Sequence, residues 1–467
     1  MSTEIRAMRI AIILAAASLA APALPAQTGK QAPPPLGAPK DFRLPAKREF
    51  TLPNGLAVTL VPFGNVPKAN VSLAIDVGNV HEGPNEVWLA DVVGDLMNEG
   101  TTEKTNAQIA ELTAGMGGAI GIGVGSDQTT IGGSVLSESA PDFIRLVAEV
   151  VQKPRFPESE LPRIKAGRLR QVAIAKSQPQ ALAQEKFAQV LYGDHPYGRV
   201  FPTEAMLQGY TMDQIRKFHA EHFGAGRSRL YVAGVFDAAA VEGAIREAFG
   251  GWAKGTPAPS NPPKARSGRR VELIDRPGAV QSTLYVGLPV PDPTHADYTP
   301  LVVTDALLGG SFGSRITSNI RENKGYTYSP NSVIATHVKD AYWAEVADVT
   351  TDVTGASLKE IFAEVERLRR EPPPQGELRG IQNNLAGIFT LQNGSRGGLI
   401  NQLQFVDRHG LPDEYLTGRV RSIMAVTPDQ VTRIMRTYLR PENMAIVVVG
   451  DKAKVEEQLK PYTSPVP

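Results

Sequence analysis

Two stretches of the chain, more than 200 residues apart, repeat the same pattern of residues. Tyr210–Ile215 resembles Val426–Val431, and each stretch is followed by an amphipathic helix and an apolar strand that ends in glycine. The offset is 427 − 211 = 216 at the start of the pattern and 450 − 234 = 216 at the glycine. Because an internal repeat of this length indicates two copies of one folded module, it constrains the fold more than any other feature.

A second match lies upstream, where Val71–Gly78 resembles Val280–Gly287 at an offset of 287 − 78 = 209. The segment Thr256–Ser267 contains four prolines and few apolar residues, which is typical of a linker. The sequence therefore predicts one module at residues 48–255 and another at residues 268–460, joined by a linker at 256–267.

Each module mixes short strands with long helices. An Asn-Gly pair inside Phe50–Leu60 predicts two strands around a tight turn. Further strands are predicted at Val71–Val77 and Thr129–Leu136, and helices at Glu86–Met97, Asn106–Met116, Glu158–Lys176 and Gln180–Leu191. This order is not a run of βαβ units. It indicates an α+β fold of two homologous tandem modules, each a mostly antiparallel sheet packed against long helices.

Six glycines lie within Gly115–Gly125, which raises the question of a phosphate-binding loop. Such loops follow a strand and open a helix. Here a predicted helix precedes the glycines and a predicted strand follows them. We therefore interpret the stretch as a loop that leads into an alternating strand.

The amino terminus has the pattern of an export signal. Arg6 and Arg9 precede the apolar run Ile10–Leu24, which is shorter than a bilayer-spanning helix. We predict a signal peptide at residues 1–26 and a Pro-rich, extended tether at residues 27–47. The mature protein is then expected in a bacterial periplasm or outside the cell, with no permanent membrane anchor.

Composition removes several classes of function. The chain has no cysteine, which excludes disulfide scaffolds, thiolate zinc fingers, iron–sulfur clusters and cysteine nucleophiles. The formal net charge of +1 provides no basic surface of the kind that binds nucleic acid. Imidazole chemistry is limited to seven histidines, which are His81, His195, His219, His222, His295, His337 and His409.

Several short strings follow one another in a characteristic order. They are Leu52-Pro53-Asn54-Gly55-Leu56, Asn98-Glu99-Gly100-Thr101, His195-Pro196-Tyr197-Gly198, Gly309-Gly310-Ser311-Phe312-Gly313-Ser314-Arg315 and Ile320-Arg321-Glu322-Asn323-Lys324-Gly325-Tyr326-Thr327-Tyr328. With the duplication, this order resembles the pitrilysin/insulinase family of inverted-zinc-motif peptidases, which includes the mitochondrial processing peptidase subunits. The resemblance runs from about Arg48 to Asp451.

The resemblance implies a zinc motif, H-x-x-E-H, at residues 91–95, with a distal Glu ligand near residue 171. In this chain Asp91 and Asp95 replace the two histidines, Gly94 replaces the general base, and Gln171 replaces the distal Glu. All four roles are vacant, so we predict no zinc ligand and no catalytic base in this chain. Two carboxylates and an amide would suit Ca²⁺ or Mg²⁺ instead, but without a base at residue 94 hydrolysis would lack its proton acceptor.

The histidines do not replace the missing ligands. His219 and His222 are three residues apart with no third partner, and the repeat places Met435-Arg436-Thr437-Tyr438 at the same positions, so helix-end packing is expected. His195 is expected to order a turn. The other four, His81, His295, His337 and His409, lie in polar, loop-like sequence and are expected to be solvated.

The second module retains two residues that matter in the family. The resemblance implies that an Arg and a Tyr seven residues apart contact the substrate backbone and steady the oxyanion at the zinc site. Arg321 and Tyr328 have that spacing. A guanidinium and a phenol are suitable donors to a carbonyl oxygen that develops charge.

Together these features predict a substrate-binding subunit that is inactive alone. It would supply Arg321 and Tyr328 to a zinc site in a homologous partner subunit, and the complex would act on a peptide or unfolded protein. No cofactor is expected in this chain, since zinc would belong to the partner. Two alternatives are a non-enzymatic scaffold or peptide-binding protein of the same fold, and a stand-alone metallopeptidase with a rearranged metal site.

Overall fold

The computed structural model describes residues 37, 39–259 and 261–463. The predicted signal peptide and most of the predicted tether lie outside these residues. The chain divides into two compact units, Met1–Pro39 and Lys40–Pro467, and the fold described below belongs to the second. In the described part of the chain, no helix has both the length and the apolar character needed to cross a membrane.

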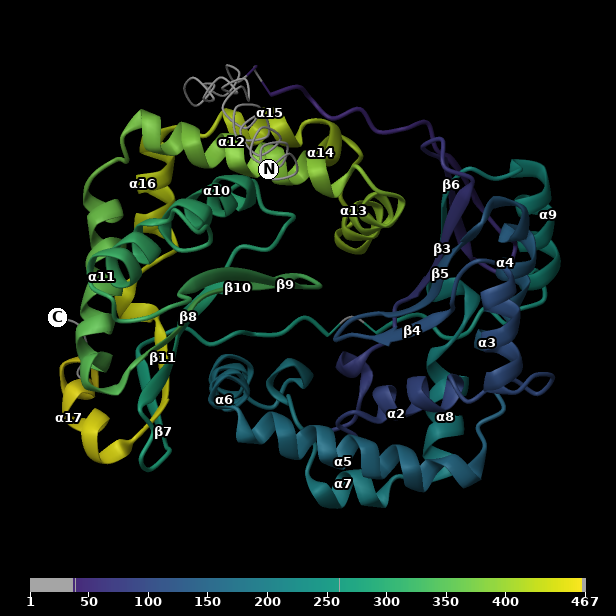
Figure 1. Ribbon diagram of the computed structural model, residues 1–467, viewed down its shortest axis with the longest axis horizontal. Coiled ribbons are helices and arrows are strands. Elements are labelled where there is room, and N and C mark those ends of the chain that lie inside the picture. Colours follow the sequence, from purple (N-terminus) through teal and green to yellow (C-terminus); the bar gives the residue numbers. More distant parts are fainter. Residues whose placement is uncertain (1–36, 38, 260, 464–467) are drawn as a thin grey trace, which may run out of the picture. The chain divides into compact units, whose positions relative to one another are not determined.

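A six-stranded sheet forms the centre of the first module (Figure 1). Its order is β1-β2-β6-β3-β5-β4, with β2 and β6 parallel and all other neighbours antiparallel. The strands are β1 (Arg48–Thr51), β2 (Ala57–Pro62), β3 (Lys68–Ile75), β4 (Gly121–Val124), β5 (Thr129–Leu136) and β6 (Ser228–Gly234). The predicted turn between β1 and β2 is present, and Gly55 has a φ of 96°, which a side chain would strain.

A five-stranded sheet of order β7-β11-β8-β10-β9 forms the centre of the second module. Its strands are β7 (Arg270–Asp275), β8 (Gln281–Val290), β9 (Asn331–His337), β10 (Asp340–Thr350) and β11 (Ala445–Gly450). The order matches β2-β6-β3-β5-β4 strand for strand, including the single parallel pair. The predicted α+β fold of two homologous modules, each with a mostly antiparallel sheet, is therefore confirmed.

The register of the strands corrects one of the two predicted repeat offsets. Val232 pairs with Val71 in the first sheet, and Val448 pairs with Leu284 in the second. The offset between β6 and β11 is 448 − 232 = 216, as predicted, but between β3 and β8 it is 284 − 71 = 213. The predicted offset of 209 is wrong because two apolar strands that end in glycine can be aligned in more than one register.

Helices surround both sheets. The first module contains α2 (Leu89–Met97), α3 (Asn106–Gly115), α4 (Ala140–Gln152), α5 (Leu161–Ser177), α6 (Pro179–Tyr192), α7 (Glu204–Gly209), α8 (Met212–His222) and α9 (Ala238–Phe249). The second contains α10 (Tyr298–Leu308), π-helix η6 (Thr317–Asn323), α11 (Thr354–Arg370), α12 (Gln375–Gln392), α13 (Arg396–His409), α14 (Glu414–Thr417), α15 (Arg419–Met424), α16 (Pro428–Thr437) and α17 (Lys452–Thr463).

Each module contributes one helix that packs on the sheet of the other module. Alternate residues of β6 face opposite sides of the sheet, and those on one side, including Tyr231, pack against α13 of the second module. In the same way, Tyr285 of β8 and Val447 of β11 pack against α6 of the first module. Each sheet therefore has one face covered by helices of its own module and one face covered by a helix from the other.

Three local features differ from the sequence predictions. Helix α2 begins at Leu89 rather than Glu86, because Trp88 has a φ of 68° and interrupts helical geometry. The Gly-rich stretch is not only a loop, since it contains strand β4 at the sheet edge. The end of the predicted tether packs on the second module, with the ring of Phe42 placed 5.5 Å edge-on from that of Phe389.

Candidate functional site

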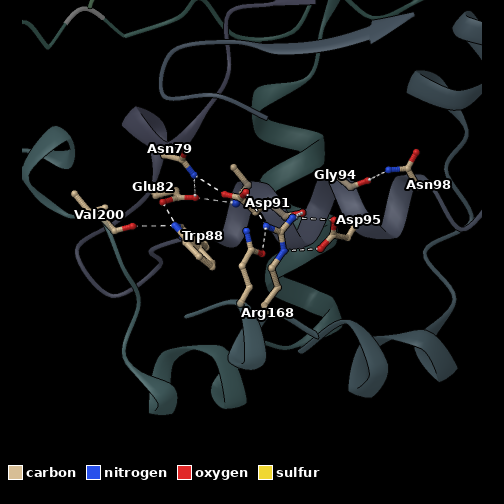
Figure 2. A network of polar contacts seen from close by, with 11 residues as sticks. Asn79, Glu82, Trp88, Asp91, Gly94, Asp95, Asn98, Arg168 and Val200 are labelled. Carbon is tan, nitrogen blue, oxygen red and sulfur yellow. Dashed lines mark hydrogen bonds and ion pairs between the residues drawn. The ribbon is translucent and has the colours of Figure 1, made fainter. Parts of the chain in front are cut away.

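Helix α2, which carries the predicted zinc-motif positions, buries one face and presents Asp91 and Asp95 on the other. Val92, Val93 and Leu96 have no solvent exposure and belong to the core of the first module. Residues four apart lie one above the other on a helix. The two carboxyl groups therefore project from the same side of α2, as the spacing predicts (Figure 2).

Glu82 holds the start of α2 in place of an N-cap side chain. Its carboxyl oxygens accept hydrogen bonds from the backbone N–H groups of Trp88 and Ala90 at 3.0 and 2.9 Å. The side-chain amide of Asn79 donates to Glu82 at 3.0 Å and to Asp91 at 2.7 Å. Burial raises the pKa of Glu82 to about 8. Near neutral pH this carboxyl group is therefore mostly uncharged.

Arg168 on α5 lies between the two aspartates. Its Nε and Nη2 donate to the two carboxyl oxygens of Asp95 at 2.6 and 2.8 Å, and its Nη1 donates to Asp91 Oδ1 at 3.1 Å (Figure 2). The same Nη1 donates to Gln171 Oε1 at 3.1 Å. The guanidinium thus contacts all three side chains that stand where the family places zinc ligands.

Electrostatics make this cluster stable as an ion-pair network. The side chains of Arg168 and Asp91 are only 15% and 17% exposed. Burial alone would lower the pKa of Arg168, but the hydrogen bond and charge of Asp95 and the charge of Asp91 outweigh it and raise that pKa. Burial raises the pKa of Asp91 while Arg168 opposes the shift. The two-pronged pairing with Asp95 is the strong form of this interaction.

These residues do not fit a zinc ion. Asp91, Asp95 and Gln171 do converge, but they offer oxygen atoms only, and a guanidinium already occupies the point of convergence. The described residues contain no group of three or more His, Asp or Glu side chains placed to hold a metal. A Cβ atom at Gly94 would also lie 2.8 Å from Val124 Cγ2, so β4 closes over the position of the missing base.

Arg168 is the residue that the sequence analysis missed. It lies three residues before Gln171, and residues three apart on a helix share a face. A basic residue at that spacing, opposite two aspartates at zinc-ligand positions, was the available signal. It can be recognised only once α5 is known to face α2.

The histidine pair His219 and His222 serves packing, as predicted. The Nε2 atom of His219 lies 2.9 Å from the backbone oxygen of Val151, and its ring stacks on Phe223 with centroids 4.6 Å apart. Burial lowers the pKa of His219 to about 4. The ring is therefore neutral at physiological pH and bonded to the backbone.

The remaining histidines fit the predictions only in part. His195 accepts a hydrogen bond from the backbone N–H of Tyr197 and orders its turn, as expected. His295 is exposed, as expected. The prediction of solvated rings is wrong for His81, His337 and His409. His409 is buried at the end of α13, His337 stacks on Tyr197 with centroids 3.9 Å apart, and burial lowers the pKa of His81 to about 4.

The structure does bring Arg321 and Tyr328 together. Arg321 lies on η6, a seven-residue π-helix of a kind that is rare and frequent at functional sites. Its Cζ atom lies 5.2 Å from the ring centroid of Tyr328 and 4.4 Å from that of Phe312. Among described residues its ion-pair partner is Glu322, with Nε 3.5 Å from the carboxylate. The sequence analysis did not single out Phe312.

The glycine-containing loop that carries Phe312 is bonded to α10 and β9. The N–H of Gly310 donates to the backbone oxygen of Asp305 at 2.8 Å, and Gly309 accepts from the N–H of Ser332 at 3.2 Å. A Cβ atom at Gly309 would lie 2.4 Å from Glu345 Oε2. A side chain at residue 309 would have to displace Glu345, which is buried in the middle of β10, and Ser332 of β9.

Comparison with known families places both halves of the chain. Residues 62–201 match the family model "Insulinase (Peptidase family M16)", and residues 209–385 match "Peptidase M16 inactive domain". Together the two models cover more than half of the chain. The chain belongs to the insulinase family. The first match contains Asp91, Asp95 and Gln171, and the second contains Arg321 and Tyr328.

Relatives within the family extend over most of the chain. A Mycobacterium bovis protein named "Uncharacterized zinc protease" is 26% identical over 433 residues, which cover 89% of this chain and 96% of the relative. The Bacillus subtilis protein named "Uncharacterized zinc protease YmxG" is 24% identical, covering 86% and 98% respectively.

Two solved structures have the same fold. A peptidase M16 inactive domain from Pseudomonas fluorescens has a TM-score of 0.80 at 25% identity, covering 87% of this chain and 98% of that one. A protease from Helicobacter pylori has a TM-score of 0.81 at 19% identity, covering 87% and 100%.

Proposed function

We propose that this insulinase-family chain is the non-catalytic, substrate-binding subunit of an exported heterodimeric zinc peptidase. The observation that carries the proposal is a contrast within the chain. The Arg168 guanidinium is bonded to the side chains at the zinc-ligand positions, of which Asp95 and Gln171 border a pocket of about 490 Å³. Arg321 and Tyr328 line another pocket, of about 290 Å³, in which the Arg321 guanidinium has one long ion-pair contact. A chain that retains only the second set needs its missing groups from another subunit.

The chemistry of Arg321 and Tyr328 suits a reacting peptide carbonyl. No hydrogen bond ties the Arg321 guanidinium to another described residue, so its N–H groups are available to a substrate. Tyr328 is 80% exposed, and its phenol can donate to the same oxygen. Preorganised donors of this kind stabilise charge on an oxyanion. In the proposed complex, zinc and the general base come from a homologous subunit with an intact H-x-x-E-H motif.

The substrate is a peptide or an unfolded protein segment, because an extended backbone presents the carbonyl groups that these donors recognise. The proposed site of action is the periplasm or the exterior of a bacterial cell, as the sequence of residues 1–26 suggests. The Arg168 cluster argues against the stand-alone metallopeptidase, since a cation already occupies the place of the metal.

Co-expression with a zinc-bearing homologue from the same organism tests the proposal. We expect a stable complex that cleaves a fluorogenic peptide library, while this chain alone does not. Arg321→Ala should lower kcat/KM of the complex about a hundredfold, as loss of one oxyanion donor does. Arg379→Ala is the matched control, because Arg379 is an exposed residue of α12 that does not line the pocket.

Each alternative has a distinct outcome. A stable complex whose activity is unchanged by Arg321→Ala would show that the assigned role is wrong. A complex without peptidase activity would favour the scaffold. Turnover by the isolated chain that a chelator abolishes would instead support the rearranged metal site.

A further inference from the structure

We propose that Phe312 determines substrate specificity, by forming with Tyr328 an aromatic wall that receives an apolar side chain of the bound peptide. The inference rests on the proposed function and adds a subsite to it. Arg321 would hold the peptide backbone, and the adjacent pocket would select the residue beside the carbonyl that Arg321 binds.

The two rings are exposed at a cost in free energy that the fold itself does not explain. Phe312 is 77% exposed and Tyr328 is 80% exposed, and they lie before and after η6 in the chain. An aromatic side chain left in water forgoes roughly 1.5–3 kcal/mol of burial. Both rings contact the same guanidinium, that of Arg321, so they form one surface rather than two isolated exposed residues.

The loop that carries Phe312 is rigid enough to present the ring in one place. Ser314 has no solvent exposure, and its hydroxyl lies 2.9 Å from that of Thr317 at the start of η6. The N–H of Ser314 donates to the backbone oxygen of Ser311 at 3.0 Å. With the contacts of Gly309 and Gly310 to the core, the residues on both sides of Phe312 are anchored. A fixed aromatic surface loses little conformational entropy when it binds.

The lining of the pocket defines the chemistry of its occupant. Besides the two rings and Arg321, the described lining residues are uncharged, namely Ser311, Thr317, Ser329, Pro330 and Asn331. The volume of about 290 Å³ is just below the ~300–1,000 Å³ typical of ligand pockets. It suits one large side chain rather than a folded domain. A basic side chain would find no opposite charge among the lining residues. An acidic side chain would pair with Arg321 and so compete with the peptide carbonyl for it.

The pocket adjoins a sheet edge at Asn331. Asn331 is the first residue of β9, and β9 pairs with β10 on one side only. An extended peptide that approaches this edge places alternate side chains on the same face. One of those side chains can therefore enter the pocket while the backbone remains within reach of Arg321.

Binding of matched peptides to the purified chain tests the inference. The probes are fluorescein-labelled, C-terminally amidated decapeptides of Gly and Ser with Phe, Leu or Ser at one central position. We expect the Phe and Leu peptides to bind about tenfold more tightly than the Ser peptide in fluorescence anisotropy. Phe312→Ser should reduce this ratio to about one, and Phe312→Leu should retain part of it.

Leu391→Ser provides the matched control, because Leu391 is as exposed as Tyr328 at 80% but does not line the pocket. It should leave the ratio unchanged. A free-acid peptide that ends in Phe separates recognition of an internal carbonyl from capture of a terminal carboxylate. If the free acid alone shows the Phe preference, the occupant is a peptide terminus and the internal-residue form of the inference is wrong.

The remaining outcomes separate this inference from the proposed function. Equal affinity for all three peptides, with Arg321→Ala still weakening each of them, overturns the apolar subsite and leaves the proposed function standing. No binding of any peptide overturns both. If Phe312→Ser preserves peptide preference but changes the oligomeric state in light scattering, the rings belong to a subunit interface and the inference is wrong.

Discussion

The polar cluster on α2 and the pocket at η6 both contain an arginine, but the two arginines have opposite surroundings. Arg168 contacts two carboxylates and an amide, so its hydrogen-bonding capacity is used within the fold. Arg321 lies between two exposed rings and has one long ion-pair contact, with Glu322. The first arginine is part of the structure, and the second is available to a ligand.

This difference shows how one chain of a duplicated fold can lose a metal site and remain stable. If the zinc ligands were replaced by other polar residues and nothing else changed, the new side chains would lack hydrogen-bond or ion-pair partners. The guanidinium of Arg168 supplies a positive charge and five N–H donors at that point. The first module therefore holds an ion-pair network at the positions where the resemblance implies the zinc motif, and Arg321 and Tyr328 lie in the second module.

Restoring the family's ligands tests the comparison most strongly. The four changes Asp91→His, Gly94→Glu, Asp95→His and Gln171→Glu together should give only weak zinc binding while Arg168 remains. Each unit of positive charge on zinc that lies about 4 Å from the guanidinium costs on the order of 4 kcal/mol. Adding Arg168→Ala should tighten zinc binding about a thousandfold, measured by competition with a chelating dye. Equal zinc affinity with and without Arg168 would contradict the assigned role.

Removing the guanidinium should destabilise the first module. Arg168→Met leaves Asp91 and Asp95 as like charges without the guanidinium that pairs with both, and we expect a loss of about 2–4 kcal/mol in the free energy of unfolding by urea. The further changes Asp91→Asn and Asp95→Asn should recover most of it. Arg170→Ala, an exposed site on the same helix, is the control and should have little effect. If Arg168→Met and Arg170→Ala lower the free energy of unfolding equally, the loss reflects a general sensitivity of α5 to substitution and not the ion pairs of Arg168.

Two glycines near the second site form a matched pair. A Cβ atom at Gly309 would meet Glu345 and Ser332, whereas one at Gly313 meets nothing within 4 Å. We expect Gly309→Ala to cost about 1–3 kcal/mol through overpacking and Gly313→Ala to be neutral or slightly stabilising. Thermal unfolding measures both. Equal effects would show that the loop adjusts freely, which would weaken the case for a rigid Phe312.

The pH dependence of stability tests the structural role of His219. Its pKa is about 4 in the fold and near 6.5 when unfolded, so between these values the unfolded chain binds the extra proton. Stability is therefore fully present above about pH 6.5 and falls as the pH drops towards 4, by at most about 1.4 kcal/mol per pH unit. Denaturation at pH 7 and pH 5 should show a smaller difference in His219→Gln. An unchanged difference would assign the acid sensitivity to other groups.

Much of the fold was predictable because it depends on local periodicity. The alternation in Thr129–Leu136 and the Asn-Gly turn before β2 each specify their element within a few residues. The spacing of Asp91 and Asp95 placed both on one helical face. The family resemblance, rather than spacing alone, predicted that Arg321 and Tyr328 act together, and they line one pocket. Local rules also have limits, since they did not reveal that Trp88 delays the start of α2.

The sequence by itself determined that the chain is a duplicated α+β protein, with Asp91, Gly94, Asp95 and Gln171 at the positions where the family resemblance implies the zinc motif. Tertiary structure alone decided what those residues contact. Arg168 pairs with Asp95 and Asp91, which lie 73 and 77 residues earlier in the sequence. Helices α6 and α13 each cover the sheet of the other module. Such contacts depend on which faces the packing of helices brings together. The periodicity of a single segment does not determine which helix faces pack together. Side chains become buried and charges become paired only when distant segments come together and exclude water.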